Sequence, residues 1–573
     1  MLATRVRQPA AHFTRHLRPT LVTGRSLNAP WRRLASGKAK QSPSNWLTTS
    51  LGVAVAGTAG FLGYSYLTGN FKDTWINSQI PKNEVIDINE LRADFIQEKR
   101  SLKSPGVYTW GSNEYKVVDP GSKDADVKTP RRFKYFNGQL LRDFKVDEKS
   151  GAAITENGDL VQWGKGFSET EFKPSKTLTG KNLTSLALSE NRLIALSSDG
   201  TIYSIPISKS EQITGPKHRE SSWVPLWGGR SALSYRILKP ALKLGEKVTS
   251  IRGGQEHVVM LTSSGRVFTA ASSTESYPTL GQLGVPGLTW STRPSGPADA
   301  CHEVETLKGL KVTQIASGDY HALALTSDGR LFAWGDNSFG QLGVQFEPSA
   351  PFKDTPFVLP VEKYYRKAFY CPTVTSVAAG GATTFFTVDS ERILGREEDA
   401  AKVRDLGNVT ADTWSCGRGI WGTLGSGKWI HIQDSPNKVK DLSGLGEYNE
   451  KLKQITPIRL RHMSVGTNHV AAVLDNEAAL NTKNAESLDK SKDFGYEVFW
   501  WGGNEHFQLG TGKRSNQSRP TYIKAPSESA KKPEPEARLQ IMPRHKGPVG
   551  KTTKSMEQRV ECGRHVSAIY SAL

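Results

Sequence analysis

The sequence predicts an all-β fold, a seven-bladed β-propeller, from three observations. A unit that reads strand, strand, tight turn, strand, wide turn recurs between residue 106 and the C-terminus, and dipeptides such as Asp328-Gly329 separate its alternating apolar runs. The chain is also rich in glycine and tryptophan, with 54 and 14 of its 573 residues. Asp-Gly and Asn-Gly between alternating runs are strong signals for two-residue hairpins. A small repeated sheet cannot bury both faces alone, so such units stack until they close a ring.

The clearest unit is VTQIASGDYHALALTSDGRLFAWGDNSFGQLG, residues 312–343. Its third strand alternates Phe332 and Trp334 with smaller apolar residues, so the large side chains point to one face of the sheet. Other copies, some of them degenerate, begin at Gly151, Leu183, Val248, Val374 and Met463. Together these copies account for six units of the predicted ring.

A seventh unit is divided between the two ends of the chain. Residues 560–573 contain the inner strands of a unit, without the turn and the Trp-Gly strand that should follow. The missing part is found at residues 106–113, which read GVYTWGSN. One blade built from both ends would close the ring and leave no free sheet edge. The sequence therefore predicts a propeller over residues 105–573, closed by pairing of its N- and C-terminal strands.

The repeat resembles that of a known family. The pattern G-x-x-H-x-x-A-L-x-x-D-G-x-x-x-x-W-G-x-N-x-x-G-Q-L-G is similar to the regulator of chromosome condensation repeat, whose family forms seven-bladed propellers. The matching residues are Gly318, His321, Ala324, Leu325, Asp328, Gly329, Trp334, Gly335, Asn337, Gly340, Gln341, Leu342 and Gly343. Two positions depart from the pattern, since Thr383-Thr384 stands in place of histidine and Ile205 in place of tryptophan. Members serve nucleotide exchange, ubiquitin ligation, ribosome biogenesis and organelle assembly, so the resemblance implies a fold and not one activity.

The N-terminal segment has the composition of a targeting sequence. Residues 1–40 are rich in arginine and hydroxyl-bearing residues, and Asp73 is the first acidic residue of the chain. This composition is typical of a mitochondrial transit peptide. The alternative is a basic tail that binds RNA or the nuclear import machinery. Residues 1–72 hold ten Lys or Arg, so the net charge of +19 leaves 19 − 10 = +9 for the rest, a weak argument for nucleic acid as a partner.

An uncharged apolar run follows, and it predicts one transmembrane helix at residues 46–67. Gly52, Ala56 and Gly60 fall every four residues and would form a face on which another membrane helix can pack. Residues 73–104 are expected to be a linker that contains an amphipathic helix. These features predict a single-span protein of the inner mitochondrial membrane.

The side of the membrane that the propeller faces depends on the flanking charges. Lys38 and Lys40 favour a matrix position for the N-terminal flank, which would place the propeller in the intermembrane space. Lys72 on the other flank weakens this preference, so the matrix orientation stays open.

The chain contains no motif that predicts catalysis, a cofactor or a metal site. Gly422–Lys428 matches the phosphate-binding pattern GxxxxGK, but Trp429 stands where Ser or Thr is needed, and the glycines belong to the repeat. The histidines at 257, 321, 469 and 565 recur one per unit, so we expect structural imidazoles bonded to the backbone. The four cysteines are far apart in the sequence and are expected to be unpaired thiols.

Insertions into the repeat are the expected binding regions, because loops on a rigid ring carry recognition. Candidate partner-binding residues are Trp223 and Trp227 in residues 209–247, Tyr364 and Tyr365 in residues 345–372, and Lys531 and Lys532 in residues 526–558. The last loop is rich in lysine and proline and could also contact RNA or anionic lipid.

The layout is similar to that of fungal mitochondrial members of the family. The resemblance implies a non-enzymatic assembly factor whose partners are respiratory chain subunits or other assembly factors, with cytochrome bc1 complex (complex III) biogenesis as the expected process. One alternative is a factor of the mitochondrial ribosome or of RNA, which requires a propeller in the matrix. Another is guanine nucleotide exchange on a small GTPase, although the contacts of the exchange-active member cannot be located in this chain.

Overall fold

The computed structural model describes residues 104–219, 230–274, 277–365, 369–395, 398–400, 402–403, 405–449, 453–479, 494–523, 538–550 and 552–573. The predicted transit peptide, the predicted transmembrane segment with Gly52, Ala56 and Gly60, and the predicted linker helix lie outside these residues and remain predictions. Within the described ranges, we find no helix whose length and apolarity would suffice to span a bilayer.

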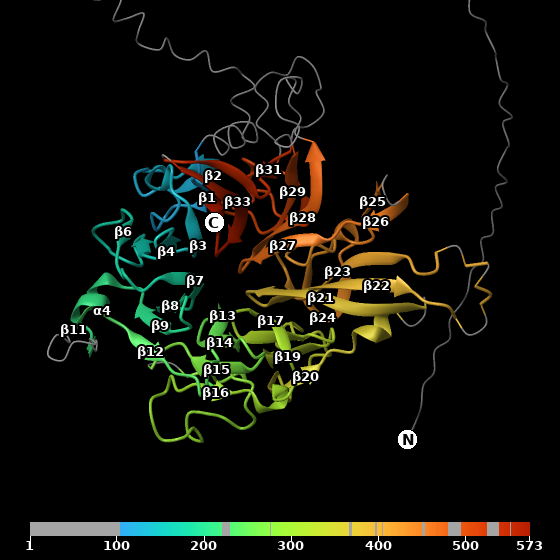
Figure 1. Cartoon of the computed structure of the whole chain (residues 1–573), viewed down its shortest axis with the longest axis horizontal. Coiled ribbons are helices and arrows are strands. Elements are labelled where there is room, and N and C mark those ends of the chain that lie inside the picture. Colours follow the sequence, from blue (N-terminus) through green and yellow to red (C-terminus); the bar gives the residue numbers. More distant parts are fainter. Residues whose placement is uncertain are drawn as a thin grey trace, which may run out of the picture. The chain divides into compact units, whose positions relative to one another are not determined.

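The described residues form an all-β, propeller-like ring (Figure 1). Five of its sheets are separate, and in each the strands pair antiparallel in chain order. From the inner to the outer strand, these sheets are β7 (Leu183–Leu188), β8 (Arg192–Ser197), β9 (Ile202–Pro206) and β12 (Arg236–Leu238); β13 (Val248–Gly253), β14 (His257–Thr262), β15 (Val267–Ala271) and β16 (His302–Glu303); β17 (Val312–Ser317), β18 (His321–Thr326), β19 (Leu331–Asp336) and β20 (Phe352–Val358); β21 (Tyr370–Gly380), β22 (Thr383–Arg392), β23 (Val409–Gly419) and β24 (Ile430–Lys438); and β27 (Leu460–Val465), β28 (His469–Ala479), β29 (Phe494–Gly502) and β30 (Gln517–Thr521), where β31 (Gln540–Ile541) also pairs with β29.

A sixth, nine-stranded sheet contains the two ends of the propeller. Its strands are β1 (Val107–Ser112), β2 (Asp126–Arg132), β3 (Leu141–Val146), β4 (Gly151–Thr155), β5 (Leu160–Trp163), β6 (Ser175–Lys176), β32 (His545–Val549), β33 (Thr552–Cys562) and β34 (Val566–Ala572). A single parallel pair, Leu141↔Ala572, joins the five-stranded group β32-β33-β34-β1-β2 to the four-stranded group β3-β4-β5-β6. The separate blades therefore number five rather than the seven expected from the repeats, because this pair merges the two groups into one sheet.

The remaining elements in the described ranges are small insertions and turns. They are the helix α4 (Lys209–Thr214), the hairpins β10 (Lys217–Arg219) with β11 (Arg230–Ser234) and β25 (Gly446–Asn449) with β26 (Gln454–Pro457), and four 3-10 turns at Lys134–Phe136, Glu305–Leu307, Val361–Tyr364 and Lys440–Leu442.

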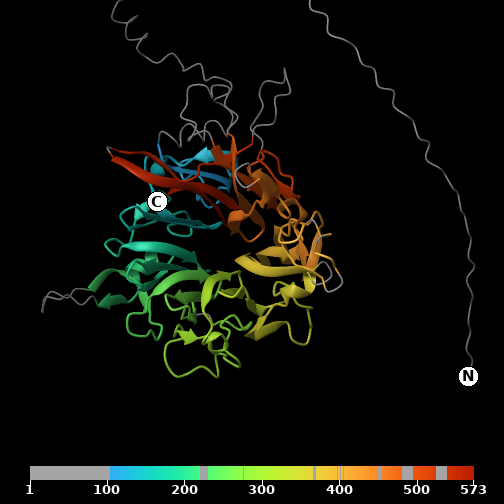
Figure 2. The same ribbon diagram turned by 45° about the vertical axis from the view of Figure 1, so that its right-hand side comes forward.

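The inner strands follow one another around a closed cycle. Each contacts the next in the order β3, β7, β13, β17, β21, β27, β33 and back to β3. Figures 1 and 2 show these sheets side by side around the ring, with the blue N-terminal strands next to the red C-terminal strands, where β34 lies between β1 and β33. The ring therefore closes where the two ends of the propeller meet.

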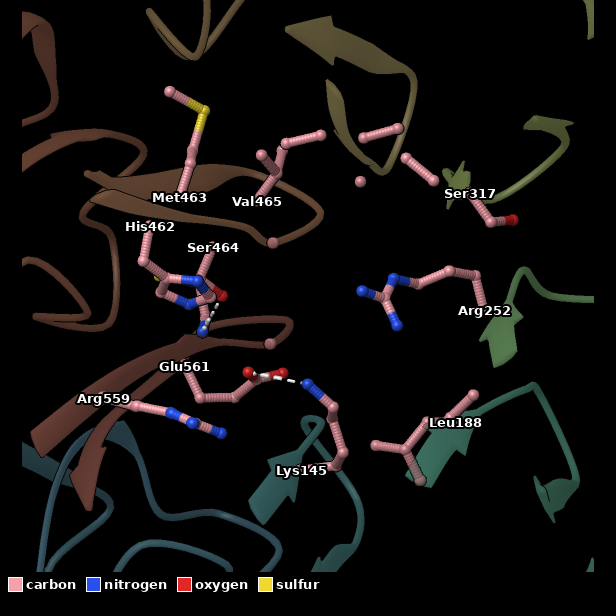
Figure 3. Close-up of a pocket in the computed structure, with 18 of the residues that line it drawn as sticks. Lys145, Leu188, Arg252, Ser317, His462, Met463, Ser464, Val465, Arg559 and Glu561 are labelled. Carbon is pink, nitrogen blue, oxygen red and sulfur yellow. Dashed lines mark hydrogen bonds and ion pairs between the residues drawn. The ribbon is translucent and has the colours of Figure 1, made fainter. Parts of the chain in front are cut away.

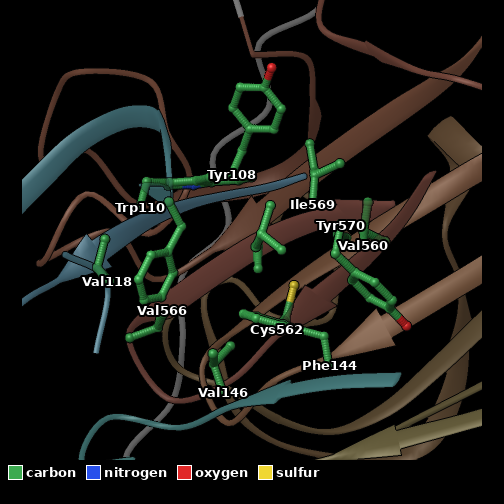
Figure 4. Packing of buried hydrophobic residues seen from close by; sticks show 14 of the residues in the cluster. Tyr108, Trp110, Val118, Phe144, Val146, Val560, Cys562, Val566, Ile569 and Tyr570 are labelled. Carbon is green, nitrogen blue, oxygen red and sulfur yellow. The ribbon is translucent and has the colours of Figure 1, made fainter. Parts of the chain in front are cut away.

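Closure uses the strands that the sequence predicts. β1 pairs antiparallel with β34 from Val107↔Tyr570 to Gly111↔Val566. Figure 4 shows the packed side chains at this junction, where Trp110, Val566 and Ile569 are each 0% exposed. The predicted pairing of N- and C-terminal strands is confirmed.

The hairpins differ from the expected two-residue type. In the turn after β18, the Gly329 amide donates to the Thr326 carbonyl and the Thr326 amide donates to the Arg330 carbonyl. Ser327, Asp328 and Gly329 thus form a three-residue loop, in which Gly329 has φ +79°. This is a type I turn followed by a left-handed residue, which glycine adopts without strain. The prediction of a hairpin at Asp-Gly was right, and its predicted loop length was wrong.

Tryptophans join neighbouring sheets through their indole N–H groups. Trp334 Nε1 donates to the Gln282 carbonyl at 3.0 Å and Trp501 Nε1 donates to the Thr423 carbonyl at 2.7 Å, in each case on the preceding sheet. Trp110 does the same across the closure junction, at 2.9 Å from the Gln508 carbonyl. The recurring Trp-Gly pairs are therefore packing elements, as the sequence predicts.

Candidate functional site

The inner strands enclose a central cavity of about 860 Å³. All seven inner strands contribute to its wall. The charged side chains are unevenly distributed, since Asp143, Lys145, His462, Arg559 and Glu561 come from the adjacent strands β3, β27 and β33. At the same level, the wall formed by β17 and β21 presents small residues such as Ala316 and Ala378. At this level the charged side chains are therefore grouped on β3, β27 and β33, whereas β17 and β21 contribute uncharged residues.

An ion pair lies at the centre of the charged side (Figure 3). Lys145 Nζ lies 2.8 Å from Glu561 Oε2 and 3.9 Å from Asp143 Oδ1. Burial alone would lower the pKa of Lys145, but the charges of Glu561 and Asp143 raise it above its usual value. Asp143 Oδ2 also accepts a 2.7 Å hydrogen bond from the Leu186 amide. This network joins three neighbouring strands of the wall.

Arg252 faces this pair from β13 (Figure 3). Its Nη1 donates to the carbonyl of Ile251 at 2.8 Å, and no described carboxylate lies within ion-pair distance of it. His462 lies nearby, and burial together with the charge of Lys145 lowers its pKa to about 4, so its imidazole is neutral at pH 7. Most of the charged and hydrogen-bonding groups of the cavity thus interact with one another within its wall.

Two kinds of reactive site, a nucleophilic thiol and a metal centre, are not indicated by the described residues that line this cavity. Cys562 belongs to its wall, but burial raises the pKa of its thiol well above the usual range, which keeps the sulfur protonated. In the part of the chain that the structure describes, no three His, Cys, Asp or Glu side chains are grouped to hold a metal ion.

The recurring histidines connect neighbouring sheets. His257, His321 and His469 are 0% exposed, and their Nε2 atoms lie 3.0, 2.8 and 2.7 Å from hydroxyls on the next sheet, namely Ser317, Thr384 and Ser567. The prediction of a structural role is right for these three, whereas the predicted partner, the backbone, is wrong, because the next sheet presents a hydroxyl there.

Two of these hydroxyls fix the histidine tautomer. Thr384 Oγ1 donates to the Gln341 carbonyl and Ser567 Oγ donates to the Gln508 carbonyl, both at 2.7 Å. Each hydroxyl therefore uses its proton elsewhere and accepts one from Nε2 of the histidine. The G-x-x-H spacing has a steric reason too, since a Cβ on Gly318 would lie 2.2 Å from Cε1 of His321.

Only two of the predicted partner-binding residues lie in the described part of the chain. Trp223, Trp227, Lys531 and Lys532 lie outside it. Tyr365 is 4% exposed, its hydroxyl donates to Asp412 at 2.8 Å and accepts from Trp414 Nε1 at 2.7 Å. Burial raises its pKa.

Tyr364 stacks on Trp414, with ring centroids 5.1 Å apart. Both tyrosines thus serve the packing of the β21–β24 sheet, and a contact between them and a partner stays a prediction.

The structure exposes an apolar cluster that sequence reasoning missed. Ile420, Trp429 and Ile432 are 44%, 55% and 38% exposed, at the ends of β23 and β24. We call this cluster, with Arg418 and Trp421, the Ile420–Trp429 patch. A signal was present in the repeat, because Arg418-Gly-Ile420 replaces the polar Asp336-Asn-Ser338 of the clearest unit.

Comparison with known families identifies the repeat. Two family models, both described as "Regulator of chromosome condensation (RCC1) repeat", match residues 312–341 and residues 328–387 and 497–532. The chain therefore contains segments that match the RCC1 repeat. Those matched residues that the structure describes lie in the sheets β17–β20, β21–β24 and β27–β30.

The chain is similar in sequence to proteins with diverse names. The chain is 26% identical over 438 residues to "Protein FMP25, mitochondrial" of Saccharomyces cerevisiae, which covers 72% of this chain and 64% of the relative. It is 27% identical over 248 residues to "Ultraviolet-B receptor UVR8" of Arabidopsis thaliana, covering 42% of this chain and 50% of the receptor. The matches thus span less than two thirds of the length of these relatives.

Solved structures support the fold. Human WBSCR16 is similar with a TM-score of 0.53 and 18% identity, covering 82% of this chain and 99% of that protein. Prp20p of Saccharomyces cerevisiae is similar with a TM-score of 0.50 and 19% identity, covering 82% of this chain and 92% of that protein. At these identities the likeness concerns the RCC1 propeller fold alone.

Proposed function

We propose that this protein is a non-enzymatic, protein-binding propeller of mitochondria that acts in assembly of the respiratory chain, with complex III as the first client to test. The observation that carries the proposal is the similarity to mitochondrial FMP25 over 72% of the chain. A basic, arginine-rich N-terminus with no acidic residue before Asp73 supports the same compartment.

The architecture suits a binding platform. We propose to count the ring as seven blades, by dividing the nine-stranded sheet at its single parallel pair, because seven inner strands then form the cycle. A closed ring holds its loops rigidly, and the exposed apolar side chains lie on its outer strands and loops. In this proposal the predicted membrane span would anchor the ring to the inner membrane.

Two other functions are weaker candidates. A ribosome- or RNA-associated role would rest on the basic segment around Lys531 and Lys532, whose contacts lie outside the described residues. A role in nucleotide exchange would rest on the fold similarity to Prp20p, but a similar fold at 19% identity is no evidence for a shared activity.

Deletion of the gene tests the function directly. We expect loss or slowing of complex III assembly on native gels of mitochondrial membranes, with cytochrome oxidase and ATP synthase measured on the same gels as controls. Protease treatment of mitoplasts decides the side of the membrane, since an intermembrane-space propeller is digested once the outer membrane is opened. Unchanged levels of all three complexes in the deletion strain would contradict the assembly role.

A further inference from the structure

The Ile420–Trp429 patch lies where two strands of one sheet end. Gly419 and Ile430 form a pair of the β23–β24 ladder, so Ile420 and Trp429 follow on the two strands and lie next to each other. Ile432 lies two residues along β24, which forms the outer edge of its sheet. Ile420, Trp429 and Ile432, each more than a third exposed, are thus grouped at one end of the β23–β24 ladder.

Stacked rings hold this surface in place. The Arg418 guanidinium carbon lies 4.8 Å from the Phe339 ring centre and 4.5 Å from that of Trp421, so the cation is held between two aromatic rings. The Trp429 ring lies against Gly422, where a Cβ would come within 2.9 Å of its Cζ3 atom. The patch is therefore ordered before any partner binds, which reduces the entropy lost on binding.

Positive charges surround the apolar centre. Lys428 is exposed next to Trp429, and the Arg519 side chain, 69% exposed, lies against Gly427. Arg519 is 4.0 Å from Asp441, a distance at the limit of an ion pair, and Arg418 forms no ion pair with any described residue. Tryptophan and arginine beside exposed aliphatic groups are the composition of protein-binding hot spots.

We propose that the Ile420–Trp429 patch binds an acidic amphipathic segment of a partner protein. This inference rests on the proposed function and names the kind of partner that the platform accepts. Aliphatic side chains of the segment pack on Ile420, Trp429 and Ile432, while its flanking Asp or Glu residues pair with Arg418, Lys428 and Arg519. The segment does not need to pair with β24 as an added strand, because the side chains of the patch supply both the apolar contact and the charge.

The shape of the patch favours a protein over a lipid surface. Ile432 lies on a strand, Trp429 directly precedes that strand with its Cζ3 atom near Gly422, and Arg418 is held between Phe339 and Trp421. Strands β23 and β24 present these side chains, whereas interfacial membrane anchors are typically amphipathic helices. An ordered apolar group with a charged rim instead resembles the core and rim of a protein interface.

Peptide binding tests the proposal on the purified full chain in mild detergent. The probe is a labelled amphipathic peptide with leucines on one face and glutamates on its flanks, and the comparison peptide carries lysines in place of the glutamates. We expect the glutamate peptide to bind at least about tenfold more tightly than the lysine peptide. Trp429→Ala and Arg418→Glu should each weaken its binding by about tenfold or more.

A matched control is present in the connection between β15 and β16. Trp290 is 54% exposed and stacks with Arg293 at 4.2 Å, much like the tryptophan and arginine of the patch. Trp290→Ala should leave peptide binding unchanged, and thermal unfolding of all variants checks that each remains folded. Equal losses for Trp290→Ala and Trp429→Ala, or equal affinity for the two peptides, would overturn the proposal. Binding to cardiolipin vesicles without binding to the glutamate peptide would overturn it too.

The patch and the proposed function can fail separately. A strain that carries Trp429→Asp should lose complex III as the deletion strain does. If deletion lowers complex III and Trp429→Asp does not, the patch proposal fails and the assembly role stands. If deletion has no effect, the assembly role fails, and the peptide measurements still decide the patch.

Discussion

A chain that lacks residues 566–573 is expected to lose its folded propeller. These residues form β34, which pairs with β33 on one side and β1 on the other, and all seven of its strand residues are buried. Its removal also takes away Ser567, the hydroxyl partner of His469. Each large apolar side chain that loses its burial costs about 1.5–3 kcal/mol, against a free energy of unfolding of about 5–15 kcal/mol for a typical domain. Circular dichroism during heating should show no cooperative transition.

An excision of similar length provides the control for this truncation. Residues 447–456 contain most of the β25–β26 hairpin, where Tyr448 and Ile455 are 64% and 75% exposed. Gly446 and Pro457 are cross-strand partners, so a short join can replace the excised residues. This variant should melt nearly as the parent does. A truncated chain that kept the parent's transition and its resistance to protease would show that β34 does not close the ring.

Acid is expected to destabilise the folded protein steeply between about pH 6.5 and pH 4. Burial lowers the pKa of His257 to about 4 and those of His321 and His469 to about 3. In the unfolded chain these histidines take up protons near pH 6.5, whereas in the folded chain they stay neutral until about pH 3–4. The stabilisation is therefore complete above about pH 6.5 and decreases as the pH falls. These three histidines contribute about 4 kcal/mol per pH unit to the slope, and His462, whose pKa is also lowered to about 4, adds about 1.4 kcal/mol per pH unit.

Denaturant unfolding at pH 7, 6 and 5 measures this slope. His321→Gln keeps a hydrogen-bonding side chain and cannot titrate, so its slope should be lower by about 1.4 kcal/mol per pH unit. Ile455 is 75% exposed and carries no titratable group, so Ile455→Gln should leave the slope unchanged. A parent protein with equal stability at pH 7 and pH 5 would contradict the assignment of these histidines as buried, neutral links between sheets.

The sequence allowed prediction of the features that repeat along the chain. Gly329 and Trp334 mark a turn and a buried strand within about ten residues of each other, so their positions follow from local pattern. The closing strands could be found as well, because the unit that is incomplete at residues 560–573 is completed at residues 106–113. Turn length was missed, since Asp-Gly fits both a two-residue hairpin and a type I turn with a left-handed glycine.

Contacts between sheets could not be predicted from the same pattern. His321 bonds Thr384, 63 residues away, and Tyr365 is buried by Asp412 and Trp414, 47 and 49 residues away. The sequence therefore predicted an exposed, partner-binding Tyr365 in an insertion, whereas the structure places its side chain in the core. The Ile420–Trp429 patch was missed for the converse reason, because its residues lie in a segment that otherwise follows the repeat, and binding residues were expected in the insertions.

The most direct test of ring closure is a disulfide between its two ends. Thr109 and Ala568 are cross-strand partners of β1 and β34. The Ser112 amide donates to His565 and the Ser571 amide donates to Gly106, so residues 109 and 568 form a non-hydrogen-bonded pair, in which the Cα atoms lie close enough for a disulfide. Thr109→Cys with Ala568→Cys should yield a linked peptide by mass spectrometry after oxidation of the folded chain, while Thr109→Cys with Ala333→Cys should not. Absence of the 109–568 link, or equal yields from both pairs, would contradict a propeller closed by its own termini.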